Sequence, residues 1–463
     1  MDVLIAGAGP TGLMLAYELA LAGVDVTVLE RLDMRIEQTK GGSLQARTAE
    51  VLDLRGLLGP IRARELPREK VGGHFAGLPV PLDASPWNTR HPYPISVPQW
   101  IVEEELERAA AARGVRVRRG AEVSAVAQDS DGVTVTAGGE LLQARYLVAC
   151  DGAHSTVRKL LDVPFPGRSG TFRAVLTDVR LSSVSDEVPT SVGHFSTMTK
   201  QAGEYWGMLV PVGEGKYRFT FGRDGVASAD ETAQALSVLY GEETRIAEVL
   251  NSSEFGDATR QLESYRYGRI LFAGDAAHIH PPFGGQGLNL GIQDAFNLGW
   301  KLAAAVHGTA DLLDTYQVER HPAAARVLRH TAAQRVFALP GPSEDVVELR
   351  EIFTDLMRLP DTNRYLAGMM SGLDVADRIA DFELVTGEGP VWLSTLLHSG
   401  RGLLLDFEGR TWPDGWADRV DVLQVKSDGE HDALLIRPDG LLCWSGGADV
   451  TSALTRWFGV RAG

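Results

Sequence analysis

Apolar positions along the chain change period several times, and the first changes come close to the N-terminus. The run Val3–Ala6 is continuously apolar and rich in β-branched residues, which predicts a buried strand. Leu13–Ala22 has the composition of a helix, and Val24–Leu29 returns to a strand pattern. A strand, a glycine-rich turn, a helix and a second strand in this order predict an α/β unit of the nucleotide-binding type.

The turn after the first strand has glycines at the spacing that a dinucleotide requires. Gly7 permits a tight turn, Gly9 lets the backbone approach a pyrophosphate, and Gly12 lets the helix pack closely on the sheet. Glu30 ends the second strand, where an acidic side chain can bind ribose hydroxyl groups. A glycine-rich turn without a nucleotide is the alternative, but it does not explain the strands, helix and acid together. These residues do not distinguish NAD from FAD.

Two later strand-like runs also end in polar motifs. Residues 146–150 lead into DGAHSTVRK at 151–159, and residues 269–273 lead into GDAAH at 274–278. The segment HPPFGGQGLN follows at 280–289, before a helical pattern. A carboxylate at a strand end can accept hydrogen bonds from sugar hydroxyl groups, and consecutive glycines let the backbone lie against a flat ring.

Together these motifs resemble, in order and spacing, the three signatures of the single-component (group A) flavoprotein aromatic hydroxylases, the p-hydroxybenzoate hydroxylase-like family. The resemblance covers roughly the first 330 residues. The stretch QTKGGSLQARTAEVL at 38–52 and the C-terminal extension are similar to the actinobacterial hydroxylases of polycyclic aromatic polyketides and to the related rifampicin monooxygenases. The resemblance implies an α/β protein: a Rossmann-like FAD-binding fold with an inserted antiparallel-sheet substrate domain and a C-terminal thioredoxin-like module.

The resemblance also assigns cofactor contacts position by position. Thr11 and Gly12 are expected at the FAD pyrophosphate, and Glu30 at the adenosine ribose. The expected FAD-binding residues are Gly9, Thr11, Gly12, Glu30, Arg31, Lys40, Gln99, Val123, Asp151, Asp275, Gly285, Gly287, Leu288 and Asn289. NADPH or NADH is expected as a transient reductant, and the chain has a single GxGxxG motif.

Several of these assignments have a physical reason or a departure from the family pattern. Lys40 stands where relatives usually carry an arginine, which keeps the charge and loses a bidentate fork. Gln99 opens a helix predicted over 99–113, and Val123 matches a position beside the adenine. The helix after Asn289 would direct its N-terminus, with roughly +0.5 charge, at the flavin, where it favours the anionic reduced form.

The segment between the second and third motifs changes to a β pattern. Strands at 172–181, 191–199, 205–212 and 217–223 predict an antiparallel sheet over the flavin, and helices are expected at 232–239 and 244–250. The expected substrate residues are His194, Trp206, Met208, Arg218, Pro282 and Phe283. Core packing of the aromatic residues and structural roles for His194 and Arg218 remain alternatives. Trp87, His91 and Tyr93 are candidates for the pocket rim, with a plain surface loop as the alternative.

The remaining chain reads as helices followed by a small β unit. A kink is expected at Pro322, with Arg320 and His321 on the helix surface. Strands at 403–407 and 420–425, a hairpin at 433–444 and a helix at 450–458 resemble a thioredoxin-like module in which EGRT replaces a CxxC pair. The predicted domains are FAD-binding (1–170 and 266–330), substrate-binding (171–265), a helical linker (331–384) and a thioredoxin-like domain without CxxC (385–463).

The composition of the chain limits the kinds of molecule that we expect it to bind. Lys and Arg number 45 and Asp and Glu 61, a net charge of −16, which argues against nucleic acid and anionic membrane. Two cysteines and no long apolar run predict no disulfide framework, no metal centre, no membrane segment and a cytoplasmic location. We expect a small aromatic substrate and O2 as partners, and a homodimer as the assembly.

The resemblance implies an FAD-dependent monooxygenase that hydroxylates a polycyclic aromatic, polyketide-type phenol with NAD(P)H and O2 through a flavin C4a-hydroperoxide. No side chain is assigned as a catalytic acid or base, because the flavin performs the chemistry. Antibiotic inactivation of the rifampicin type, a Baeyer–Villiger variant and a non-catalytic FAD-binding module remain alternatives.

Overall fold

A six-stranded sheet forms the centre of the protein in a computed structural model, which describes residues 1–463 except 38–40, 223–226, 339–340, 427–430, 447–448 and 462–463. Its strands are β1 (Val3–Ala6), β2 (Val26–Leu29), β5 (Arg116–Arg118), β9 (Tyr146–Ala149), β17 (Arg266–Tyr267) and β18 (Ile270–Phe272). The order is β17-β18-β9-β1-β2-β5, and every neighbouring pair is parallel apart from β17 and β18. Every residue of β1, β2 and β9 is buried, as expected for parallel strands covered on both faces.

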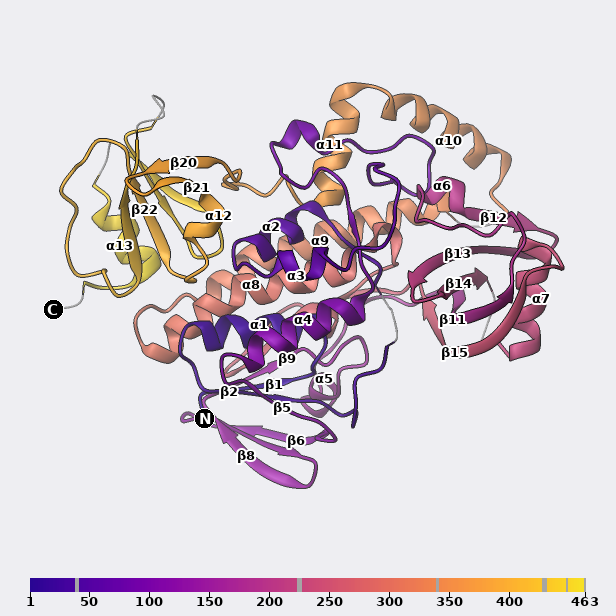
Figure 1. The fold of residues 1–463 in the computed structure, drawn as a ribbon. Helices are drawn as coiled ribbons and strands as arrows, with labels where there is room; N and C mark the ends of the chain where they lie inside the picture. The colour runs from indigo at the N-terminus through magenta and orange to yellow at the C-terminus, as the bar shows by residue number, and fades with distance from the viewer. Residues whose placement is uncertain (38–40, 223–226, 339–340, 427–430, 447–448, 462–463) are drawn as a thin grey trace.

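Three helices cover one face of this sheet, and a small antiparallel sheet lies beyond the other (Figure 1). The helices are α1 (Pro10–Leu21), α4 (Gln99–Ala111) and α8 (Gln286–His307), and α1 packs between the other two. The small sheet contains β6 (Val123–Gln128), β7 (Val133–Ala137) and β8 (Glu140–Ala144). One continuous apolar core joins these layers, which makes the N-terminal turn a fixed platform.

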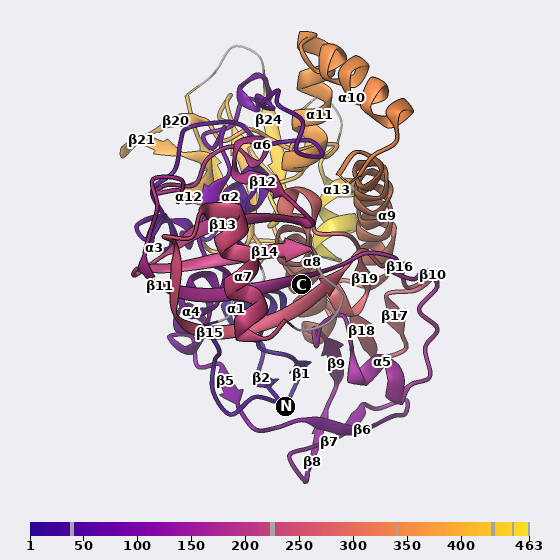
Figure 2. The ribbon, with the colours of Figure 1, turned by 90° about the vertical axis from the view of Figure 1, so that its right-hand side faces the viewer.

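A five-stranded antiparallel sheet stands beside the helical layer, and in Figure 2 it faces the viewer. It contains β11 (Arg173–Ser183), β12 (Thr199–Ala202), β13 (Tyr205–Gly213), β14 (Lys216–Gly222) and β15 (Arg245–Gly256), in the order β12-β13-β14-β11-β15. Helix α7 (Ala229–Tyr240) packs on one face of the sheet, where its apolar side chains join Leu209, Phe219 and Phe221 in a second core.

Two predicted elements in this region are wrong. Residues 244–250 were expected to be helical, but Arg245–Gly256 forms β15, which pairs along β11. The predicted strand 191–199 is not formed: residues 195–198 make the short helix α6 (Phe195–Met198), for which His194 is the N-cap, and a strand begins only at Thr199. In both places tertiary pairing and a local cap override the short-range pattern.

Short elements in the connecting segments complete the region around the central sheet. They are β3 (Ser43–Leu44), α2 (Ala46–Asp53), α3 (Leu58–Arg62), η1 (Ser85–Trp87), β4 (Ile95–Ser96), α5 (Thr156–Leu160), β10 (Gly167–Arg168), β16 (Thr259–Gln261), η2 (Gly274–Ala276), β19 (His278–Ile279) and η3 (Phe283–Gly285). Strands β3 and β4 pair with each other, and β10, β16 and β19 form a three-stranded sheet.

Helices α9 (Leu313–Ala338), α10 (Glu344–Met357) and α11 (Pro360–Ser371) follow α8. Helix α9 runs without interruption past Pro322, and α9 and η3 are neighbours. The expectation that Arg320 lies on the helix surface is wrong, because the residue is only 7% exposed and its side chain bonds to Asp294 of α8.

The C-terminal part forms a separate four-stranded sheet at the end of the helical layer (Figure 1). The four strands are β22 (Gly402–Asp406), β23 (Val420–Gln424), β24 (Ala433–Ile436) and β25 (Leu442–Ser445). This part of the chain also contains the pair β20 (Glu383–Thr386) and β21 (Gly389–Trp392) and the helices α12 (Leu393–Leu396) and α13 (Thr451–Phe458). Arg55 ties it to the nucleotide-binding part, because its guanidinium binds Glu18 and the carbonyl groups of Leu397 and Pro438. The whole is a mixed α/β fold. Of the helices in the described ranges, none has the length and apolar character needed to cross a bilayer.

Candidate functional site

The glycine-rich turn leaves an open space at the carboxyl end of β1. Gly7 has φ +103°, and a Cβ there would overlap the carbonyl oxygen of Cys150. A Cβ on Gly12 would overlap the Gly7 carbonyl, whereas a Cβ on Gly9 would meet no described heavy atom within 4 Å. Gly9 is also the N-cap of α1, and no described side chain caps this helix. The first amide groups of α1 therefore face open space, which suits a phosphate.

Glu30 lies beside this turn, at the end of β2. Its Oε2 accepts a hydrogen bond of 2.8 Å from the backbone N–H of Ala8, and its Oε1 accepts one of 2.9 Å from that of Leu32. A carboxylate held in this way has lone pairs left for ribose hydroxyl groups. Arg31, the next residue, is exposed.

The segment after β9 reaches from the glycine-rich turn to the third motif. One oxygen of Asp151, Oδ2, accepts from the backbone N–H of Val157 at 3.1 Å, whereas no described residue gives a partner to the buried Oδ1. The Arg158 guanidinium donates to the carbonyl groups of Ala276 (3.0 Å) and Ala153 (2.8 Å), and burial lowers the pKa of Arg158. The second and third motifs are thereby joined, and a buried acceptor is left for a ligand or water.

Asp275 projects from the tight loop that follows β18. Gly274 has φ +61°, and a Cβ there would lie 2.7 Å from Thr11 Oγ1. Asp275 itself is exposed, and its Oδ1 lies 3.7 Å from the place of a Cβ on Gly287. The structure therefore brings Thr11, Asp275 and Gly287 close together, although they come from three distant segments, and the region that they border is called the crevice here.

The N-terminus of α8 borders the same crevice. Gly284 and Gly285 have φ +74° and +62°, which favours glycine, and no described side chain caps the helix at Gly285. Asn289 is 1% exposed; its Oδ1 accepts from the Gln45 backbone N–H at 2.7 Å, and its Nδ2 donates to the Gly285 carbonyl at 2.8 Å. The Asn289 side chain is thus used to fix the helix, and the amide groups of its first turn, including that of Leu288, remain available.

The remaining predicted cofactor residues lie at different depths. A Cβ on Gly41 would lie 3.3 Å from Gln99 Oε1 and 3.4 Å from Leu288 Cβ, so Gln99 is near the first turn of α8. Val123 is a buried core residue, which leaves its backbone for a cofactor contact. Lys40 lies outside the described residues.

The donors and acceptors fit FAD. Two helix N-termini suit a pyrophosphate and the electron-rich edge of a flavin, and the carboxylates of Glu30 and Asp275 suit the hydroxyl groups of ribose and ribityl. The open face of Gly9 and the buried acceptor of Asp151 are independent marks of a ligand in this crevice.

The predicted substrate residues of the sheet share one face. Leu209 points into the core with α7, so Trp206 and Met208, which alternate with it along β13, point the other way and are half-buried. This face is turned toward the nucleotide-binding part, because Lys216, on the same face of β14 as Arg218, forms a 2.7 Å ion pair with Glu37.

Arg218 and His194 are held by their own neighbours. Arg218 donates from Nε and Nη2 to Asp178 at 2.8 to 3.0 Å. Burial lowers the pKa of the Arg218 guanidinium, and the charge of Asp178 opposes this shift only in part. His194 Nδ1 lies 2.7 Å from Ser196 Oγ, and burial lowers the pKa of its imidazole. These contacts agree with the structural alternative; direct substrate contacts stay predictions.

A small pocket bordered by Gln45, Tyr93 and Met370 lies next to the glycines that precede α8, and the sequence did not predict Gln45 and Met370 in this place. Gln45 donates from Nε2 to the Gly284 carbonyl at 2.9 Å, and a Cβ on Gly284 would overlap the methyl group of Met370. Tyr93 also lines this pocket, whereas His91 binds Asp53 at 2.6 Å, and the position of Tyr93 at a substrate rim stays a prediction. Pro282 is exposed and Phe283 half-buried in the adjoining loop.

Comparison with known proteins agrees with this geometry. Residues 1–331 match the family model "FAD binding domain", and residues 375–460 match "Aromatic-ring hydroxylase, C-terminal". The chain is 44% identical to a 12-dehydrotetracycline 5-monooxygenase/anhydrotetracycline 6-monooxygenase of Streptomyces rimosus, over 100% of this chain and 99% of that protein. It is 43% identical to a rifampicin monooxygenase of Streptomyces venezuelae, over 99% of each. The solved structure of anhydrotetracycline hydroxylase from Streptomyces rimosus has a TM-score of 0.90, 43% identity, and coverage of 100% and 99%.

Proposed function

Because this chain belongs to the FAD-binding domain family and is a flavin-dependent monooxygenase, we propose that it hydroxylates a polycyclic aromatic phenol of the polyketide type, with NAD(P)H and O2. The observation that carries the proposal is that Thr11, Asp275 and the first turn of α8 lie close together, while a half-buried apolar sheet face is turned toward the nucleotide-binding part. The relative at 44% identity is named for oxidation of anhydrotetracycline, which supports a substrate of that class.

Each part of the crevice has a proposed role toward FAD. The amide groups of the first turn of α1 bind the pyrophosphate, Glu30 the adenosine ribose and Asp275 the ribityl chain. The first turn of α8 places its positive end at the pyrimidine edge of the flavin, where negative charge develops on reduction. When bound, FAD supplies the redox chemistry: it accepts electrons from NAD(P)H and activates O2.

The chain contributes orientation and exclusion of water around the substrate. Trp206 and Met208 present a half-buried apolar face, and a flat polycyclic ring suits such a face. Arg218 is neutralised by Asp178, so this face offers no free cation at that position, which favours a neutral phenol over a carboxylate. Pro282 and Phe283 are the proposed contacts of the substrate on the flavin side.

A rifampicin-type substrate is the second candidate, because a rifampicin monooxygenase is 43% identical over nearly the whole chain. The test loads the protein with FAD and measures NADPH and NADH consumption with anhydrotetracycline-like phenols, rifampicin and p-hydroxybenzoate. Faster oxidation and an oxygenated product with the polycyclic phenol support the proposal. Turnover of rifampicin alone favours the second candidate, and stimulation by p-hydroxybenzoate alone contradicts both. Insertion of oxygen beside a carbonyl group would indicate the Baeyer–Villiger variant.

We further propose the domain division predicted above, with residues 385–463 as a thioredoxin-like module. The strand order β23-β22-β24-β25, in which β22 is parallel to β23 and antiparallel to β24, supports this topology. Residues 407–419 between β22 and β23 form no helix in the described structure, so the module lacks one element of that fold. Its proposed role is structural; a homodimer and a cytoplasmic location stay predictions.

A further inference from the structure

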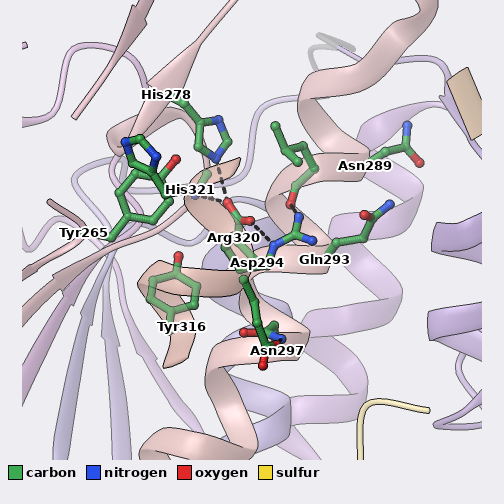
Figure 3. A network of polar contacts seen from close by, with 12 residues as sticks. Tyr265, His278, Asn289, Gln293, Asp294, Asn297, Tyr316, Arg320 and His321 are labelled. Carbon is green, nitrogen blue, oxygen red and sulfur yellow. Dashed lines mark hydrogen bonds and ion pairs between the residues drawn. The ribbon is translucent and has the colours of Figure 1, made fainter. Parts of the chain in front are cut away.

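A buried ionic cluster lies directly behind the loop that presents Asp275. Its centre is Asp294 of α8, whose side chain is 0% exposed. Arg320 of α9 donates from Nε to Asp294 Oδ1 at 2.7 Å, and His278 Nε2 lies 2.6 Å from Oδ2 (Figure 3). The backbone N–H of Gly274 donates to the same Oδ2 at 3.2 Å. One carboxylate therefore joins the Gly274 loop to helices α8 and α9.

The cluster is one turn of helix away from the proposed cofactor crevice. Gly291, three residues before Asp294 on α8, lies on the same side of the helix. A Cβ on Gly291 would overlap Thr11 Oγ1 and lie 3.5 Å from the Gly274 Cα, so these segments are in close contact. Asp294 thus holds the N–H of Gly274 on the inner side of the loop, while Asp275 projects on the exposed side.

Burying these charged side chains is energetically unfavourable. Burial alone raises the pKa of Asp294, but the charges and hydrogen bonds of Arg320 and His278 outweigh this and lower it, so the group stays ionised. His278 Nδ1 is buried, and no described residue gives it a hydrogen-bond partner, which disfavours the folded state. Well-packed apolar side chains of the same volume often give a protein of equal or greater stability. We therefore explain the presence of the cluster by the loop geometry that it fixes.

We propose that Asp294 is a positioning residue for FAD. Together with His278 and Arg320 it holds Gly274 in its left-handed conformation, so that Asp275 meets the ribityl chain without a rearrangement on binding. This inference rests on FAD as the cofactor, and no contact of Asp294 with FAD itself is required. Its effect is therefore expected in FAD affinity before it is expected in the rate of oxygenation.

The test compares Asp294→Asn with Asp257→Asn in the full chain. Asp257 is a matched control: it is 1% exposed, accepts from the backbone N–H of Thr171 at 2.7 Å, and pairs with Arg335, also on α9, at 3.2 Å. FAD is titrated into each apoprotein and its fluorescence quenching gives Kd. We expect Asp294→Asn to weaken FAD binding about tenfold or more, and Asp257→Asn to change Kd less than about twofold. Equal Kd values for the two variants overturn the proposal.

If Asp294→Asn does not fold, a second pair of variants, at His278, tests the same proposal. His278→Gln keeps an N–H donor for Asp294, whereas His278→Leu removes it. We expect near wild-type FAD affinity for His278→Gln and about tenfold weaker binding for His278→Leu; equal affinities overturn the proposal. Thermal unfolding of each apoprotein reports stability separately. If wild-type protein itself bound no FAD, the proposed function would fail, and that result is distinct from unchanged affinity in the variants.

Discussion

The side-chain oxygen of Asn289 accepts a hydrogen bond of 2.7 Å from the backbone N–H of Gln45, so the first turn of α8 is tied to the residue that follows strand β3. The Asn289 Nδ2 group donates to the backbone carbonyl groups of Ser43, in β3, at 3.0 Å and of Gly285 at 2.8 Å. Because every polar atom of this side chain is engaged, Asn289 shapes the proposed flavin site from behind, and the backbone of the helix faces the cofactor.

Replacing Asn289 should therefore loosen the site. Asn289→Ala removes three hydrogen bonds from a buried position, and we expect a loss of about 1–3 kcal/mol in unfolding free energy and weaker FAD binding. Asn363→Ala is the matched control, because Asn363 accepts from the Asp83 backbone N–H and donates to two carbonyl groups away from the crevice. Urea unfolding and FAD titration of both variants check this; a similar loss of FAD affinity in the control contradicts it.

Two glycines of the N-terminal turn should behave in opposite ways. A Cβ fits in the open space at Gly9, so Gly9→Ala should fold as stably as the wild type and lose FAD binding, because the methyl group occupies the place of the pyrophosphate. Gly12→Ala should destabilise the apoprotein itself, because its Cβ overlaps the Gly7 carbonyl. Thermal unfolding of the apoproteins and FAD titration separate the two effects. Tight FAD binding by Gly9→Ala would place the pyrophosphate elsewhere.

Glu30 should matter for the adenosine half of the cofactor only. Glu30→Gln keeps the size of the side chain and removes the charge that binds the Ala8 amide and the ribose. Since hydrogen bonds to charged groups contribute about 1.5–3 kcal/mol, FAD affinity should fall about tenfold or more while FMN affinity is unchanged. The measurement is a pair of titrations with FAD and FMN, and a parallel loss for both flavins would argue against this position for Glu30.

The contact between α9 and the C-terminal module should weaken at acidic pH. Burial raises the pKa of Glu319, but the hydrogen bond from Arg437 and the charge of Lys301 outweigh it and hold the pKa at about 2, below the ordinary 4.5. Because the folded pKa is the lower one, the stabilisation is present above pH 4.5 and is lost as the pH falls toward 2. The shift corresponds to about 3 kcal/mol.

Urea unfolding of the wild type and Glu319→Gln at several pH values measures this. The wild type should be more stable by about 3 kcal/mol near neutral pH, and the difference should shrink between pH 4.5 and pH 2. Glu348→Gln, at an exposed position on α10, should follow the wild type throughout. A difference that does not change with pH would mean that Glu319 titrates alike in the folded and unfolded chains.

Local motifs made the nucleotide-binding part predictable from the sequence. The glycine spacing and the carboxylates at strand ends are short-range signals, and the structure brings Thr11, Glu30 and Asp275 to the expected edge of the sheet. Long-range contacts were not predictable in the same way. Arg320 is buried with its charge paired to Asp294 of α8, and Met370 reaches Gly284 from the far end of α11. Neither pairing leaves a local pattern in the chain.

Isotope labelling with 18O2 tests the central claim most directly. FAD-loaded protein is supplied with NADPH, an electron-rich polycyclic phenol and labelled dioxygen, and the product is analysed by mass spectrometry. The flavin-dependent monooxygenase described above should transfer one labelled atom to the aromatic ring, and should transfer none from labelled water. A product without label, or NADPH oxidation that yields only hydrogen peroxide with every polycyclic phenol tried, would contradict the account.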